Sequence, residues 1–152
     1  MTGALTSGEP RPLPPKGRGR NVRRRILLEE EGAETISFKL WEQPSSIDWV
    51  VCPAGSGVLM SAIYKGFWEL KKLKLLDRIP RVVGVQAEGC SPVARAWKEG
   101  LMARWSKPST IASAIRVERP YDAPLAVKAA RESGGRILTV SDREIMDALR
   151  NS

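Results

Sequence analysis

The chain has 152 residues, 42% of them hydrophobic, and this length favours a single domain with one sizeable core. Its formal net charge of +8 is unevenly distributed. Residues 1–25 carry seven basic side chains and one acidic one, whereas the rest of the chain carries 18 basic and 16 acidic side chains. The main body is therefore nearly neutral, and its charge gives no reason to expect a polyanionic partner.

The residue types exclude two kinds of catalysis. The sequence contains no histidine and only two cysteines, Cys52 and Cys90, so zinc sites built from these ligands and histidine-dependent nucleophilic catalysis are excluded. No metal ligands are assigned. The sequence also lacks a run of 18 apolar residues and a secretory leader. We therefore expect a cytoplasmic protein with both thiols reduced.

Residues 1–29 are rich in proline, glycine and arginine. Prolines interrupt any periodic pattern there, and too little apolar surface is present to form a core, so this segment is predicted to be a disordered basic arm. The arm is either a solvated leader or a tail that binds nucleic acid or another partner. Residues 30–152 are predicted to form the folded domain.

Helical and extended patterns alternate after Gly32. Helices are predicted where apolar residues recur three or four positions apart, and strands where short β-branched runs are bounded by turns. In chain order the predictions are helix Glu34–Gln43, strand Ile47–Cys52, helix Leu59–Leu73, strand Arg81–Ala87, helix Pro92–Glu99, helix Pro124–Glu132, strand Arg136–Val140 and helix Asp142–Leu149. This rhythm predicts a three-layer α/β domain: a doubly wound, mostly parallel sheet with helices on both faces.

The turns between these elements carry their own signals. Gly134 and Gly135 are predicted to end one helix, and Ser141 and Asp142 to begin the last. In a sheet of this kind a ligand binds beyond the carboxyl ends of the strands, where loops meet helix N-termini. The loop after the first predicted strand is therefore the first candidate site.

That loop reads Pro53-Ala54-Gly55-Ser56-Gly57-Val58 and runs directly into a helix. Its glycines let the backbone approach an anion closely, its serine offers a hydroxyl, and the first free helix amides point at the same spot. No Walker sequence follows, and Met60 stands where a GxGxxG motif has its third glycine. From the pattern alone, the loop either binds a phosphate or is a glycine-rich turn without a ligand.

Five segments in order resemble the threonine synthase family. They are GAETISFKLWE, DWVVCPAGSGVLMSAIYKGFWEL, DRIPRVVGVQAEGCSPVARAWKEG, TIASAIRVERP and AARESGGRILTVSDREIMDA, which together lie between about Glu31 and Ser152. This family belongs to the fold-type II pyridoxal-phosphate enzymes, with tryptophan synthase β, threonine dehydratase and cysteine synthase as relatives. The resemblance implies that residues 30–152 are part of the large, pyridoxal-phosphate-binding domain of such an enzyme.

The resemblance implies pyridoxal 5'-phosphate as the cofactor, with its phosphate held mainly by the backbone amides of Gly55, Ser56, Gly57 and Val58. The commoner family pattern has glycine where this chain has Val58, but an amide remains at that position. The cofactor itself would supply the chemistry, and the protein its binding and orientation.

The resemblance also places Glu88, with its neighbours Gln86 and Ala87, at a strand end facing the cofactor. Ser113 and Ala114 would lie on a segment that passes near the cofactor ring. From the residues alone, Glu88 is a carboxylate at a strand end, and such a group either fixes a loop or takes part in a site.

The family's Schiff-base lysine lies in the first half of the enzyme, and the chain has no matching segment. None of the eight lysines from Lys39 to Lys128 stands in a resembling context, so no catalytic residue is assigned. We expect the chain alone to be inactive and to expose apolar surface where that half would dock. A truncated gene, a misplaced gene boundary or a split enzyme would each produce this sequence.

The resemblance implies that the complete enzyme converts O-phosphohomoserine and water to threonine and phosphate. A threonine or serine dehydratase-like fragment is the close alternative. A non-catalytic module that binds nucleic acid through the basic arm is the alternative of another class. The expected partners are the small-molecule substrate, the missing amino-terminal half and a second copy of the chain in a homodimer, with nucleic acid not favoured and no membrane.

Overall fold

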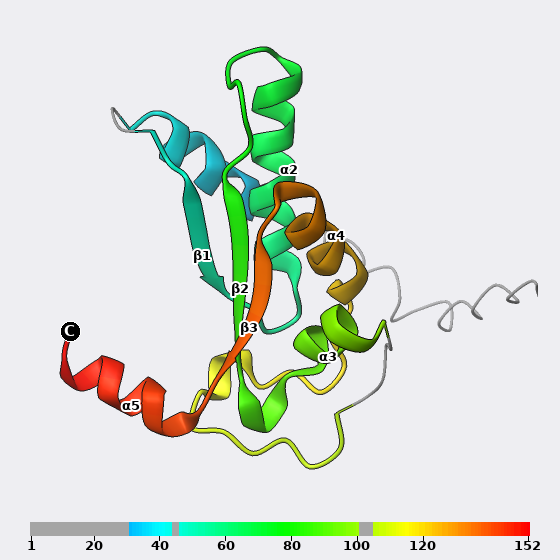
Figure 1. Ribbon diagram of the computed structural model, residues 1–152, viewed down its shortest axis with the longest axis vertical. Helices are drawn as coiled ribbons and strands as arrows, with labels where there is room; N and C mark the ends of the chain where they lie inside the picture. Colours follow the sequence, from blue (N-terminus) through cyan, green and yellow to red (C-terminus); the bar gives the residue numbers. More distant parts are fainter. Residues whose placement is uncertain (1–30, 44–45, 101–104) are drawn as a thin grey trace, which may run out of the picture.

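A computed structural model describes residues 31–43, 46–100 and 105–152, so the expectations for residues 1–29 lie outside the described residues. Three strands form one sheet: β1 (Trp49–Pro53), β2 (Arg81–Ala87) and β3 (Arg136–Val140). All pairs are parallel and the strand order is β1-β2-β3 (Figure 1). The predicted α/β class with a parallel sheet is confirmed.

The helices are residues 31–41, α2 (Val58–Lys72), α3 (Pro92–Glu99), α4 (Ala123–Ser133) and α5 (Asp142–Arg150). Two short 3-10 turns, η1 (Glu88–Cys90) and η2 (Ser113–Ile115), lie between β2 and α4. The sequence predicted the bounds of the strands and of α2 to α5 to within two residues. The first strand begins later than predicted, because its pairing with β2 starts at Trp49 opposite Arg81.

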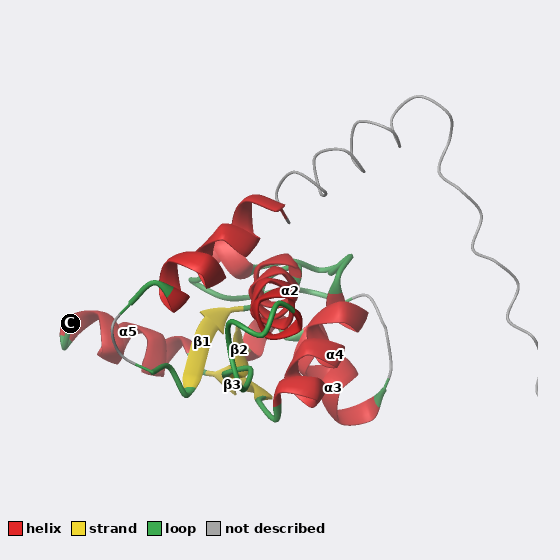
Figure 2. Cartoon of the chain, turned by 90° about the horizontal axis from the view of Figure 1, so that it is seen from above, coloured by secondary structure: helices red, strands yellow, loops and turns green. Residues whose placement is uncertain are grey.

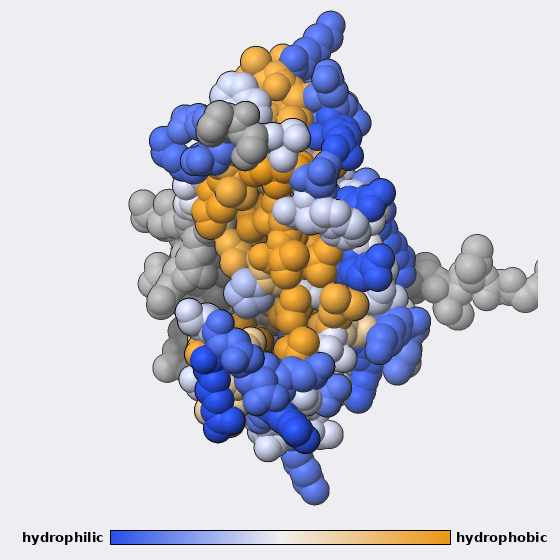
Figure 3. Space-filling model, turned by 60° about the vertical axis from the view of Figure 1, so that its left-hand side comes forward, coloured by the Kyte–Doolittle hydropathy of each residue, from blue (hydrophilic) through white to orange (hydrophobic). Residues whose placement is uncertain are grey.

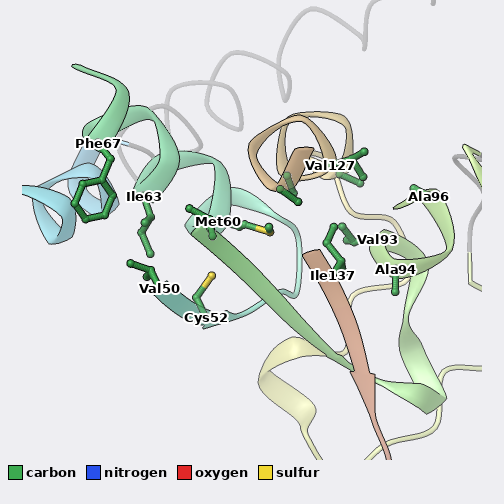
Figure 4. Close-up of a cluster of buried hydrophobic side chains, with 14 of the residues drawn as sticks. Val50, Cys52, Met60, Ile63, Phe67, Val93, Ala94, Ala96, Val127 and Ile137 are labelled. Atoms are coloured by element: carbon green, nitrogen blue, oxygen red, sulfur yellow. The ribbon is translucent and has the colours of Figure 1, made fainter. Parts of the chain in front are cut away.

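The core lies between one face of the sheet and helices α2, α3 and α4 (Figure 4). Side chains alternate between the two faces along each strand, so every second residue of a strand points to this core. The buried residues on the sheet side are Val50, Cys52, Val82 and Ile137, and the helices contribute Met60, Ile63, Phe67, Val93, Ala126 and Val127. Both crossover helices pack on one face, as parallel strands in chain order require.

The opposite face of the sheet, which we call the open face, carries the side chains of Trp49, Val51, Val83, Val85 and Leu138. Val51 is 65% exposed and Leu138 is 44% exposed. Figure 3 shows an apolar band across the middle of this side of the molecule. Helices lie on both sides of the sheet, because α5 lies on the side away from α2, α3 and α4 (Figure 2). However, α5 buries no residue and leaves the middle of the open face bare.

The helix ends follow the sequence signals. Gly134 ends α4 in a left-handed conformation with φ of +70°, and Ser141 caps α5 through a capping box with Glu144. None of the described helices is long and apolar enough to span a membrane.

Candidate anion-binding site

Residues 54–57, which we call the anion loop, join the carboxyl end of β1 to α2. The loop thus forms the βα connection that the sequence predicted. Gly57 precedes α2 with φ of +99°, a conformation that favours glycine. The N-terminus of α2 has no side-chain cap and no acidic residue in its first turn. Its positive end is therefore left to solvent or a ligand.

The carbonyl groups of the loop are bound by the protein. Gly55 O accepts a hydrogen bond from Gln86 Nε2 at 3.4 Å, Ser56 O accepts one from the Asp122 amide at 3.2 Å, and Gly57 O accepts one from the Ser61 amide at 3.0 Å. In a planar trans peptide the N–H points opposite to the C=O of the same unit. Holding these three carbonyls therefore also orients the three amides that follow them.

The amides that follow these carbonyls belong to Ser56, Gly57 and Val58. Within the described residues, the amides of Gly55, Ser56 and Gly57 donate to no protein acceptor. The amide of Val58 makes only a long bond of 3.4 Å to Ser56 Oγ. Adjacent unpaired amides at a helix N-terminus are the arrangement that binds phosphate in many proteins, and a phosphate fits it here without displacing a protein group.

The segment around η2 packs over the anion loop. A Cβ atom at Gly55 would lie 3.3 Å from Ile115 Cα and 3.7 Å from Ala114 O, so a larger residue at Gly55 would push against this segment. The segment is anchored at the start of α5, where Asp142 accepts hydrogen bonds from Thr110 Oγ1 at 2.5 Å and from the Ile111 amide at 3.1 Å. Ser113 and Ala114 are exposed and belong to this segment.

Glu88 does not lie on the anion loop. It is exposed, opens η1 just after β2, and lines a hollow of about 260 Å³ together with Arg95 and Trp105. The Arg95 guanidinium lies 4.4 Å from the centre of the Trp105 ring. Within the described residues, Glu88 makes no hydrogen bond to the loop. The structure thus brings Gly55, Ser56, Gly57 and Val58 together and leaves Glu88 beside α3.

The two thiols serve packing. Cys52 and Cys90 are both free and buried. Burial raises the pKa of Cys52 to about 11 and also raises the pKa of Cys90, so both stay protonated and unreactive near neutral pH. Among the described residues, no group of three or more acidic or cysteine side chains is placed to hold a metal ion.

Sequence reasoning did not identify two residues that hold the loop, Gln86 and Asp122. A polar residue inside the apolar run of β2 was a signal for Gln86, because a buried amide needs partners. Nothing in the sequence near Asp122 indicated that its amide would reach Ser56, because that contact joins distant segments.

A parallel sheet with an unpaired, glycine-containing amide loop at the carboxyl end of its first strand defines a phosphate-binding α/β protein. The family model described as pyridoxal-phosphate dependent enzyme matches residues 30–151. The chain therefore belongs to this family.

Among its curated relatives, the chain is 41% identical to a threonine synthase of Methanosarcina acetivorans over 125 residues, and 37% identical to one of Methanocaldococcus jannaschii. These alignments cover 80% and 78% of the chain. They cover only 31% and 30% of the relatives, so the chain spans about a third of their length.

Solved structures share the fold. The chain matches a bacterial threonine deaminase from T.th. with a TM-score of 0.61 and 25% identity, covering 78% of the chain and 42% of that structure. It matches a serine racemase of maize with a TM-score of 0.62 and 24% identity, covering 78% of the chain and 35% of that structure. The second likeness supports the fold alone.

Proposed function

We propose that this chain is the cofactor-phosphate-binding part of a threonine synthase, the enzyme that converts O-phosphohomoserine and water to threonine and phosphate. One observation carries the proposal: the anion loop presents consecutive unpaired amides in a chain 41% identical to a threonine synthase. Residues 30–152 would be the partial pyridoxal-phosphate-binding domain, and residues 1–29 a basic arm. We also propose the cytoplasm as its location, since both cysteines are free thiols.

In this proposal the backbone amides of Gly55, Ser56, Gly57 and Val58 hold the phosphate of pyridoxal phosphate, with the N-terminus of α2 adding its positive end. Pyridoxal phosphate, when bound, supplies an electron sink for the carbon next to the substrate amino group. The segment around η2 limits the space above Gly55 and excludes water from that side of the loop. Glu88 has an outer role in this arrangement, because its described contacts lie beside α3.

Covalent attachment of the cofactor would need a lysine, and the described lysines with assigned partners lie on helix surfaces. Lys39 pairs with Glu42, Lys65 with Glu34 and Lys128 with Glu132. We therefore propose that the chain binds the cofactor through its phosphate without a covalent bond.

The direct test is binding of pyridoxal phosphate to the purified full-length chain, measured by absorbance and by amide resonances of the anion loop. Pyridoxal phosphate is expected to bind and to keep the absorbance of the free aldehyde. Pyridoxal, which has no phosphate, is the matched control and is expected to bind at least about tenfold more weakly, because the charge-assisted bonds to the amides are lost. Equal binding of both compounds would contradict the loop as the phosphate site.

Activity is assayed in the same samples by adding O-phosphohomoserine and measuring phosphate and threonine. No turnover above free cofactor is expected from the chain alone. Turnover that disappears on mutation of one of its lysines would show that the chain carries a complete site.

A threonine or serine dehydratase-like enzyme is the second candidate, and the likeness to a threonine deaminase structure favours it. The two candidates differ in substrate, so the discriminating measurement uses the chain together with the remaining part of the fold. Release of phosphate from O-phosphohomoserine supports the synthase, whereas 2-oxo acid from threonine with no phosphate release supports the dehydratase.

We further propose that the open face docks against polypeptide that supplies the rest of the family's fold. The argument is one of extent and chemistry. The relatives are about three times as long as the matched part, and the open face presents Val51 and Leu138, which water solvates poorly. A homodimer through this face is the competing occupant, and adding the missing polypeptide should dissolve it.

A further inference from the structure

Gln86 is a fully buried polar side chain in the central strand of the sheet. Its oxygen Oε1 accepts hydrogen bonds from the amides of Val93 and Ala94, both at 2.9 Å. These are the first two amides of α3, because the helix begins with Pro92, which has none. Its nitrogen Nε2 donates to Gly55 O at 3.4 Å. A buried amide is costly unless its groups are bonded, and here both ends are.

The orientation of this side chain is determined by its partners. Two N–H donors face Oε1, so exchanging the oxygen and nitrogen of the amide would place donors against donors. Nε2 therefore points at Gly55 O. Because the Gly55 carbonyl and the Ser56 amide share one planar peptide unit, a bond that holds the carbonyl inward turns the Ser56 N–H outward.

We propose that Gln86 is a positioning residue of the anion loop: it holds the Gly55–Ser56 peptide so that the Ser56 amide faces the phosphate, and it ties the loop to the N-terminus of α3. This inference rests on the proposed function of the loop. The next amide, that of Gly57, is positioned separately, because its peptide carbonyl is held by the Asp122 amide. The two amides of one site thus have different supports, and a change at Gln86 affects them unequally.

The test is Gln86→Met in the full-length chain. Methionine has nearly the same length but offers no comparable donor or acceptor. We expect the Ser56 amide resonance to shift in the ligand-free protein and the Val93 and Ala94 amides to exchange with solvent about tenfold faster. On titration with pyridoxal phosphate, the response of Ser56 should be lost while that of Gly57 remains, and affinity should fall about tenfold.

The matched control is Ser37→Ala. Ser37 is also fully buried, and its hydroxyl donates to Ile63 O at 2.7 Å between the helix of residues 31–41 and α2. The control should lower overall stability and leave the Ser56 response unchanged. Gln86→Asn keeps the amide but is too short to reach both partners, so it should show the same Ser56 loss if the methionine variant does not fold.

Two outcomes separate the hypotheses. If the wild-type chain does not respond to pyridoxal phosphate, the proposed function fails, and the ligand-free Ser56 shift and the exchange of Val93 and Ala94 still judge the role of Gln86. If a folded Gln86 variant keeps all of these signals at wild-type values, the positioning role is overturned. A uniform loss at Ser56 and Gly57 would also overturn it, because it would point to general loosening.

Discussion

Gly57 combines two constraints that no other side chain meets easily. Its φ is +99°, and a Cβ atom there would lie 3.0 Å from the backbone of Asp122 and from Ala126 Cβ. Gly57→Ala should lower the free energy of unfolding by about 1–3 kcal/mol, measured by urea denaturation. Pyridoxal phosphate binding should weaken in parallel, because the amide that follows Ser56 would be displaced.

The control for this prediction is Gly134→Ala. Gly134 also has a positive φ, of +70°, but an added Cβ would meet nothing within 4 Å. Its substitution should cost only the conformational penalty, about 1 kcal/mol, without affecting binding. If the two alanine variants are equally stable and bind equally, close packing around Gly57 does not matter.

At this scale the sequence predicted the residues of the loop but not what supports them. Gly55, Ser56 and Gly57 are adjacent in the chain, so their shared role is readable from a short motif. The bonds from Gln86 and Asp122 join distant segments and depend on the packed sheet. Glu88 shows the converse: its place at a strand end pointed to the site, but the chain turns away into η1.

Among the elements, α5 is held by its cap and little else. It buries no residue, while the Ser141 hydroxyl accepts from the Glu144 amide and the Glu144 carboxylate accepts from the Ser141 amide. Ser141→Ala should therefore destabilise α5 locally by about 1 kcal/mol, with little change in global stability. Hydrogen exchange of the α5 amides measures the first effect, and urea denaturation the second.

The same cap predicts a dependence on pH. Hydrogen bonds from the Ser141 amide and hydroxyl lower the pKa of Glu144. A carboxyl whose pKa is lower in the folded state stabilises that state above its unfolded pKa, and this contribution is lost as the pH falls through the lowered value. Protection of α5 should therefore decrease in acid for the wild type and stay flat for Glu144→Gln. A flat wild-type profile would contradict the charged cap.

The element bounds were readable because their signals are local: helical spacing, β-branched runs, and capping residues such as Ser141 and Gly134. The start of β1 was not, because a strand begins where its partner begins, and that partner is Arg81 of β2.

For the whole molecule, the open face is the main liability. Val51 is 65% exposed at its centre, and β1 and β3 each have one unpaired edge within the described sheet. Val51→Lys should weaken self-association about tenfold or more, measured by sedimentation at several concentrations, because a charge would have to be buried in the contact. Thermal stability should change little, since the side chain is mostly solvated.

Leu73→Lys is the matched control for this prediction. Leu73 is 68% exposed and lies at the C-terminus of α2, away from the sheet. The same change in charge there should leave self-association as it is in the wild type. Equal effects of both lysines would mean that net charge, and not the open face, governs association.

The supports of the anion loop also bear on when the site comes into existence. Gly55 is held from 31 positions further along the chain and Ser56 from further still, so no short nascent segment can present the amides together. A phosphate-bearing ligand would then bind only chains whose β1, β2 and α4 have already assembled, and it would raise the melting temperature in proportion to its occupancy. In a cell, the cofactor would act as a sensor of completed folding, protecting assembled chains from proteolysis and leaving unassembled ones exposed to it.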